Sequence, residues 1–338
     1  MSTGRAEIQV ELNLQEIHDK SRDVTRAFRP NRPPPVDPPR SRIRPSSGKP
    51  GPPQVQDFPR RHDGRHSDLA TAASRALALV SVQEREQVLR FYFVRDAKLA
   101  LGSALLKRLA ISRLANVSWE AARWTRDSRT GKPVFLMDQD DGVGQVRFNV
   151  SHQAGLVVLV ASLCDADVDV GIDVVCPSER RDRDRNSIAA EGWSRYVAVH
   201  EDVFGPAEAA SLRARNDDVD RRLEYFYALW CLREAYIKMT GDALLAPWLR
   251  QLEMRHFAPP DVEATSALEI WFHGRRVQDV CMRLRPLLDD YMVCTAVRCP
   301  PQLRARIEEQ VAKPFTHLVL DHILSEAETG KALSEDGQ

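Results

Sequence analysis

The chain has 338 residues, of which 48 are Lys or Arg and 48 are Asp or Glu, so its formal net charge is zero. This balance gives no support to a globally basic nucleic-acid-binding protein or to a polyacidic tail protein. Apolar residues make up 43% of the chain, enough for an ordinary globular core. The sequence has no run of about 18 apolar residues, so no membrane span is predicted. The N-terminus also lacks the apolar core of a secretion signal. We therefore expect a cytoplasmic protein that binds neither nucleic acid nor membrane.

The cysteines support a reducing compartment. None of them forms a CxxC pair, and no second cluster completes a zinc site. Reduced thiols are the simplest interpretation. The six positions are Cys164, Cys176, Cys231, Cys281, Cys294 and Cys299.

The N-terminal part of the chain contains one predicted strand and one proline-rich segment. Residues 8–14 alternate apolar and polar side chains, which is the strand period. Residues 29–59 hold 11 of the 21 prolines together with many arginines and few apolar groups. Such a composition cannot offset its ordering entropy by burial. We interpret 29–66 as a flexible insertion within a domain, a solvated linker rather than an arm for an acidic partner.

The first globular half is predicted from residue 67 onwards. Ser81 and Glu84 have the spacing of a capping box at a helix start. The apolar pattern then predicts a helix over roughly 83–111, ending at Ser112. Gly131-Lys-Pro and Gly142-Val-Gly read as turns.

Strands dominate the middle of the chain. Residues 146–150 alternate, 156–163 form a continuous apolar run typical of a central strand, and 168–175 form a third strand. We interpret the charged residues 177–186 as a surface loop.

The last part combines one strong helix with two late strands. A helix is predicted over 219–240 with Gly241 as its C′ residue. Strands are predicted at 270–272 and 291–297, and one short amphipathic helix at 316–328.

The irregular alternation of strands and helices, with hairpins, favours an α+β fold over a doubly wound parallel sheet. Each half offers one long helix beside a small sheet, which is compatible with a diverged internal duplication.

Glu234 and Lys238 lie four residues apart on the second long helix, in line with Trp230. Such a pair is most often a solvated surface pair that contributes roughly 0.2–0.5 kcal/mol. Here the rest of this helix face is expected to be buried. A buried acid needs a partner or a metal.

Asp173 stands between Ile172 and Val174 inside a predicted strand. It either caps a turn at the strand end or binds a hard cation such as Mg²⁺, which prefers carboxylate oxygens and substrate phosphates.

Further polar residues suit phosphate binding. Ser151 and His152 follow a strand, and Arg126, Arg129 and Lys132 surround the Gly131 turn. A satisfied turn histidine and ordinary solvated cations are the alternatives. A Ser–His nucleophilic dyad is disfavoured because neighbours in a strand point to opposite faces.

The order of these motifs resembles the 4′-phosphopantetheinyl transferase family, in its larger monomeric type. The motifs are Asn149-Val-Ser-His, Val170-Gly-Ile-Asp and Trp230-Cys-Leu-Arg-Glu-Ala-Tyr-Ile-Lys238. The resemblance implies two similar α+β subdomains in one chain with CoA in the cleft between them. We place their expected limits at 1–163 and 164–311, followed by a tail at 312–338.

The resemblance also implies roles for individual residues. Asp173 and Glu234 match the family's Mg²⁺-binding acids, with Mn²⁺ as an alternative metal. Glu234 also matches the favoured base, and Lys238 the lysine beside the reacting phosphate. The CoA contacts implied are Arg126, Arg129, Gly131, Lys132, Pro133, Asn149, Val150, Ser151 and His152.

Three positions depart from the family pattern. Gln87 stands where a CoA-contacting arginine is expected, and Arg85 is a nearby substitute. Arg233 replaces the usual lysine and is expected to be tolerated if it meets only solvent or phosphate. Val175 stands where some members carry a third acidic ligand, so a water would fill that position.

The implied enzyme transfers 4′-phosphopantetheine from CoA to a serine of an apo carrier protein. The carriers expected are those of fatty acid synthases, polyketide synthases, nonribosomal peptide synthetases and aminoadipate reductase. The rival hypothesis is an adaptor that binds CoA or a carrier without turnover. The acid pair argues against it, since binding alone does not need two carboxylates at metal spacing.

Overall fold

The computed structural model describes residues 7–13, 71–127, 131–135, 145–164, 168–242, 246–263 and 266–335; for 7–13, 145, 164 and 331–335 it describes the backbone alone. The predicted flexible insertion at 29–66, the Gly142 turn and Arg129 lie outside the described residues.

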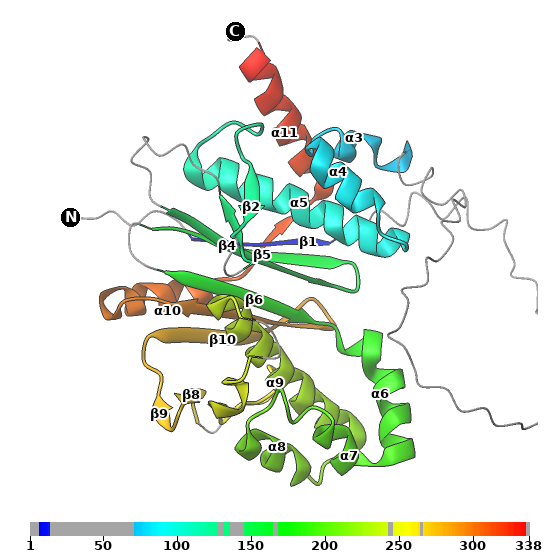
Figure 1. The fold of residues 1–338 in the computed structure, drawn as a ribbon, viewed down its shortest axis with the longest axis vertical. Helices are drawn as coiled ribbons and strands as arrows, with labels where there is room; N and C mark the ends of the chain where they lie inside the picture. The colour runs from blue at the N-terminus through cyan, green and yellow to red at the C-terminus, as the bar shows by residue number, and fades with distance from the viewer. Residues whose placement is uncertain are drawn as a thin grey trace, which may run out of the picture.

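A four-stranded sheet forms the centre of the first half, with the strand order β12-β1-β5-β4. Its strands are β1 (Glu7–Asn13), β4 (Gln145–Gln153), β5 (Leu156–Cys164) and β12 (Thr316–Leu318). Helix α5 (Val94–Ala115) lies along one face of this sheet, with the other helices of this half outside it (Figure 1). Those are α3 (Ser74–Leu77), α4 (Val82–Leu89) and α11 (Leu320–Glu335), and a hairpin of β2 (Trp124–Arg126) and β3 (Pro133–Phe135) completes the half.

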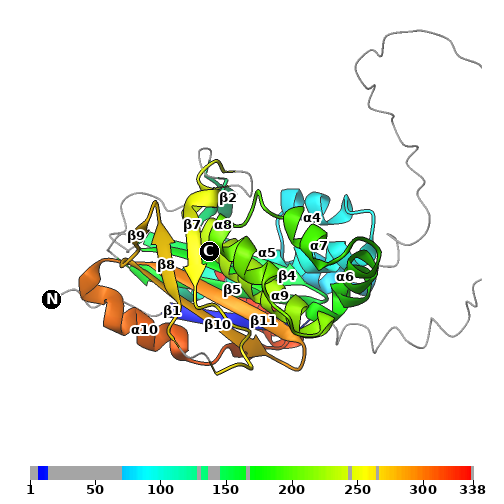
Figure 2. The same cartoon turned by 90° about the horizontal axis from the view of Figure 1, so that it is seen from below.

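The second half is built around the sheet β10-β11-β6. The strands are β6 (Asp169–Val175), β10 (Val280–Leu287) and β11 (Tyr291–Arg298). Helix α9 (Val219–Thr240) packs on β6 and β11, while α10 (Arg304–Ala312) packs on β10 (Figure 2). The remaining elements are α6 (Pro177–Glu191), α7 (Trp193–Ala198), α8 (Pro206–Arg213), the sheet β7 (Leu252–Arg255), β8 (Glu269–Phe272) and β9 (Arg275–Arg276), and two 3₁₀ turns, Leu249–Gln251 and Pro301–Leu303. The mixed architecture agrees with the predicted α+β class.

Strand β5 is buried on both faces, as its continuous apolar run predicts. Val157 and Leu159 belong to the core under α5, whereas Val158 and Val160 join the core formed with β6 and α10. The period of two thus divides one strand between two hydrophobic clusters.

The two sheets meet where β4 and β6 lie side by side. The Asn149 side chain bridges them, because its Oδ1 accepts a 3.0 Å hydrogen bond from the backbone N of Ile172. Gly171, the residue before Ile172, lies on the other face of β6, against α9. A Cβ on Gly171 would stand 2.2 Å from the carbonyl oxygen of Ala235, so only glycine permits this approach.

The predicted helix over 83–111 is two helices, with its start confirmed and its continuity wrong. The Ser81 hydroxyl accepts from Glu84 N at 3.2 Å, and the Glu84 carboxylate accepts from Ser81 N at 2.8 Å. The helix breaks after Leu89, and α5 then continues past Ser112 to Asn116, whose φ of 53° ends it. The aromatic run that begins at Phe91 continues the apolar pattern across the break and conceals it.

Residues 177–186, predicted as a surface loop, belong to helix α6. Pro177 occupies the first turn, where its missing N–H costs nothing, and Gly192 follows the end. The helix is anchored to α9 by the hydroxyl of Tyr227, which donates to Asp184 at 2.9 Å. Apart from the buried Asp184, its charged side chains are partly or fully exposed, which gave the segment the composition of a loop.

The tail differs from the single helix predicted at 316–328. Its first residues form β12, which pairs in parallel with β1, and the helix α11 runs from Leu320 to Glu335. Arg75 and Arg113 bind the Glu328 and Glu326 carboxylates of α11 at 2.7 and 2.6 Å. The C-terminal residues therefore pack on the first half of the molecule, next to its N-terminal strand.

The described helices include none that is both long and apolar enough to cross a membrane. The cysteines whose side chains are described are buried free thiols, at positions 176, 231, 281, 294 and 299.

Candidate active site

A cavity of about 480 Å³ opens between the first half of the molecule and the end of α9. Its walls come from α4 and α5, the β2–β3 hairpin, the end of β4 and the Lys238–Asp242 stretch. The structure brings eight of the predicted CoA-contacting residues to this cavity: Arg126, Gly131, Lys132, Pro133, Asn149, Val150, Ser151 and His152.

Arg85 is the predicted contact that the structure does not bring there. Its Nε donates to the carbonyl oxygen of Leu77 at 3.1 Å, on the outer side of α4. Gln87 lines the cavity instead, so the position at which the family resemblance predicted an arginine carries a glutamine. Arg129 lies outside the described residues.

The described residues on either side of the β2–β3 turn bind each other and α9. Gly131 has a φ of 67°, which favours glycine, and its N donates to Asp127 O at 2.8 Å. Arg126 donates to Gly131 O at 3.0 Å. Lys132 reaches across to the carbonyl oxygen of Met239 and lies 3.4 Å from Asp169. Burial lowers the pKa of Lys132, and Asp169 opposes that shift.

A second cavity, of about 650 Å³, adjoins the first. It is lined by the stripe of Trp230, Glu234 and Lys238 predicted on α9, and by Asp173 from β6. Three residues line both cavities, namely Ser151, His152 and Lys238. The two cavities therefore share a wall at the end of β4, beside the two acids.

Lys238 is an ion-pair partner of Asp173 rather than of Glu234, so the surface-pair alternative for the helix is wrong. Its Nζ donates to Asp173 Oδ1 at 2.6 Å and to Ser151 Oγ at 2.8 Å, and the Ser151 hydroxyl lies 2.9 Å from the same carboxylate oxygen. Asp173 is 5% exposed because the alternation of β6 points it toward α9, away from the core that holds Ile172.

Glu234 has a buried carboxylate oxygen, Oε1, that finds no hydrogen-bond partner among the described residues. Burial raises the pKa of Glu234 to about 7, and the negative charge of Asp173 adds to the shift while Lys238 opposes it. A carboxylate with an uncompensated oxygen beside a second carboxylate is a site that attracts a cation or a proton.

The acid pair fits a hard divalent cation. Mg²⁺ is usually bound by one or two carboxylates together with substrate phosphates. The described residues hold no group of three or more His, Cys, Asp or Glu side chains arranged to bind a metal without such help. Asp173 and Glu234 provide the two carboxylates that a site completed by substrate phosphates needs, and Oε1 of Glu234 is the unpartnered oxygen.

Two groups of residues at these cavities were not predicted from the sequence. Lys107 and Trp124 line the first cavity, and Arg95, Arg180 and Arg183 line the second. Lys107 lies in the predicted helix between Leu106 and Arg108. The apolar residues around it in the sequence were the available sign that its side chain is buried. The arginines come from elements that are far apart in sequence.

Arg233 is a structural residue rather than a solvated or phosphate-binding cation. It is fully buried and donates to Glu208 Oε2 at 2.6 Å and to Leu252 O at 2.8 Å. The cation that precedes Glu234 in the helix motif thus ties α9 to α8 and β7.

The amino-acid sequence matches family models and known proteins. Residues 68–164 match the family model "4′-phosphopantetheinyl transferase, N-terminal", and residues 169–295 match the model of the 4′-phosphopantetheinyl transferase superfamily. The chain is 56% identical over 237 residues to 4′-phosphopantetheinyl transferase 1 of Fusarium mangiferae, an alignment that covers 68% of this chain and 80% of the relative.

More distant relatives are similar over shorter or less conserved alignments. A 4′-phosphopantetheinyl transferase of Aureobasidium melanogenum is 34% identical over 322 residues, which covers 77% of this chain and 92% of the relative. The L-aminoadipate-semialdehyde dehydrogenase-phosphopantetheinyl transferase of Mus musculus is 34% identical over 179 residues, covering 52% of this chain and 53% of the relative.

Proposed function

The chain belongs to the 4′-phosphopantetheinyl transferase family, and on that premise we propose that it transfers 4′-phosphopantetheine from CoA to a serine of an apo carrier protein, with release of 3′,5′-ADP and with Mg²⁺ bound. The observation that carries this proposal is the wall that two neighbouring cavities share at Ser151, His152 and Lys238, next to Asp173 and Glu234. One cavity suits the co-substrate and the other the incoming serine.

The first cavity would hold CoA. Lys132 and Arg126 present cations from either side of the β2–β3 turn, which suits the phosphates of the ligand. Ser151 and Lys238 would place hydrogen-bond donors at the pyrophosphate. The second cavity would admit the carrier serine beside Glu234.

The transfer forms a bond between the serine oxygen and phosphorus and breaks the bond to the 3′,5′-ADP oxygen. Glu234, or a water molecule that it holds, would accept the serine proton. Lys238 would turn from Asp173 toward the phosphate and offset charge developing on the leaving oxygen. Mg²⁺ held by Asp173 and Glu234 would supply further positive charge to the pyrophosphate.

We also propose that the two halves are related as a pseudo-dimer. Helices α5 and α9 each have 22 residues, and each packs on a strand pair beside the β4–β6 seam. The protein would act as a cytoplasmic monomer.

The test is a single-turnover assay with CoA, Mg²⁺ and a panel of apo carrier proteins, read by mass. The panel includes carriers of fatty acid, polyketide, nonribosomal peptide and aminoadipate pathways, the last because one relative is named for that substrate. We expect a gain of one phosphopantetheine on at least one carrier. Binding of CoA with no modified carrier in the panel would support the adaptor hypothesis and sink the proposal.

A further inference from the structure

Lys107 is a buried amine that faces the first cavity. It lies on α5, is 7% exposed and belongs to the cavity lining. Its Nζ stands 3.2 Å from the centre of the Trp124 ring, a cation–π contact. No hydrogen bond to this Nζ is found within the described part of the chain, so its donors are available to a molecule in the cavity.

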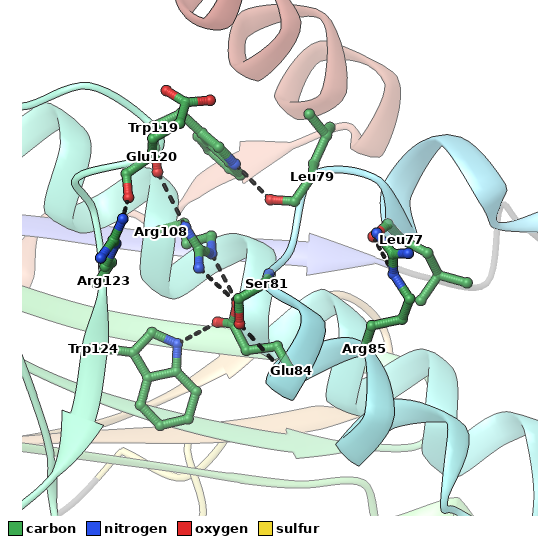
Figure 3. Close-up of polar contacts among 10 residues, drawn as sticks. All are labelled: Leu77, Leu79, Ser81, Glu84, Arg85, Arg108, Trp119, Glu120, Arg123 and Trp124. Atoms are coloured by element: carbon green, nitrogen blue, oxygen red, sulfur yellow. Dashed lines mark hydrogen bonds and ion pairs between the residues drawn. The ribbon is translucent and has the colours of Figure 1, made fainter.

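Glu84, the acid near Lys107, already accepts hydrogen bonds from other groups. Glu84 Oε2 accepts from Arg108 at 2.7 Å and from Ser81 N at 2.8 Å, and Glu84 Oε1 accepts from Trp124 Nε1 at 2.7 Å (Figure 3). The same carboxylate therefore orients the ring on which the lysine rests, but it gives Lys107 no direct partner.

Burial favours the neutral form of Lys107 when the cavity holds no anion, and the charged groups around it act in both directions. From α4 it faces Glu84, from α5 Arg108, from β2 Arg126, and from β4 His152. Burial lowers the pKa of Lys107 to about 7; Glu84 opposes the shift, and the two guanidinium groups add to it. A dianionic phosphate at Nζ would reverse this balance, because it supplies both acceptors and negative charge.

We propose that Lys107 is a specificity-determining residue that binds a phosphate group of the co-substrate and takes up one proton from solvent as that phosphate arrives. The inference rests on the proposed function, since CoA is the proposed ligand of the cavity. Lys107 differs from Lys238 in position: it lies on the α5 wall, outside the second cavity where the acids stand. It would therefore bind CoA without taking part in the transfer.

The test is calorimetric titration of CoA into the full chain at pH 8, with Mg²⁺ present, in two buffers of different ionisation enthalpy. At that pH a phosphate monoester, with a second pKa of about 6, has no proton left to exchange. A lysine with a pKa of about 7 is then roughly one-tenth charged, so wild type should take up about 0.9 proton more than Lys107→Met.

Affinity and kinetics give independent readouts. Near pH 7 Lys107→Met should weaken CoA binding by roughly ten- to a hundredfold, the range of one charge-assisted hydrogen bond. KM for CoA should rise while kcat changes little. Methionine has a similar length and packs well on an aromatic ring, so the melting temperature should not fall. Lys98→Met, on the same helix but outside both cavities, is the matched control and should retain both uptake and affinity.

Titration with dephospho-CoA identifies the phosphate. Loss of the uptake assigns it to the 3′-phosphate, and retention assigns it to the pyrophosphate; either result supports the lysine's role. Equal proton uptake by wild type and Lys107→Met on CoA binding would overturn it while leaving the proposed function standing. A wild-type chain that does not bind CoA at all would instead sink the proposed function, and the inference with it.

Discussion

The buried ion pair between Arg233 and Glu208 offers a sharp test of the structure. The two side chains are 0% and 2% exposed, and their N and O atoms lie 2.6 Å apart. Glu208 also accepts from the backbone N of Gly205 and of Met254, at 2.6 and 2.7 Å. Arg233→Met removes the cation and leaves this carboxylate buried without a compensating charge.

The expected cost follows from that burial. Removing one partner of a buried pair costs about 3–5 kcal/mol in the free energy of unfolding, because the remaining charge is uncompensated. The double variant Arg233→Met/Glu208→Gln should recover at least half of the loss, since it removes both charges. Arg233→Lys keeps the charge but loses donors to the Leu249 and Leu252 carbonyls, and we expect a cost of roughly 1–3 kcal/mol.

Urea unfolding measures these differences, and carrier modification is measured on the same samples below the transition. Arg221→Met is the matched control, because this arginine lies on the same helix in partly exposed pairs with Glu224 and Asp261. Pairs that solvent can reach contribute about 0–1 kcal/mol, so the control should remain close to wild type.

Two results would refute the reasoning. One is an Arg233→Met chain within about 1 kcal/mol of wild type, which would mean that the pair is not buried. The other is a folded Arg233→Met chain that binds CoA poorly, which would indicate that Arg233 contacts the ligand.

Three further predictions concern the candidate site and the proline-rich segment. Asp173→Ala should lower transfer by roughly a hundredfold or more with the fold intact, because it removes the partner of Lys238 and a proposed Mg²⁺ ligand; normal turnover at saturating Mg²⁺ would contradict this. The charge swap Glu234→Lys with Lys238→Glu should give a folded, inactive protein by melting and mass analysis, since it would set an ammonium against the metal and a carboxylate against phosphate; an active swap would move the site elsewhere. Deletion of 31–58 should leave melting temperature and transfer nearly unchanged, because these residues supply few apolar groups to a core; a large fall in melting temperature would refute it.

Much of the local structure could be predicted because its cause is local. The capping box at Ser81 and the left-handed Gly241 after α9 depend on neighbours within one turn. The alternation of β6 placed Asp173 on one face whatever lay opposite. The motif order, through its family resemblance, indicated most of the residues that meet at the first cavity.

Other features depended on packing partners that are remote in sequence. Residues 177–186 read as a loop, and they are helical because α9 supplies the Tyr227 hydroxyl and an apolar face to pack against. The tail forms β12 only because β1, some three hundred residues earlier, offers an open strand edge.

The same distinction holds for single charges in the site. Arg233 was expected to meet solvent or phosphate and Lys107 was not singled out, because composition and periodicity do not identify the partner of a charged side chain on a helix. Their roles were decided by Glu208 and Trp124, which the fold delivers from other elements. A residue's own sequence neighbourhood determines its helix or strand and the face it occupies, whereas its charge state and partners depend on what tertiary packing places opposite that face, since desolvation and ion pairing act through space.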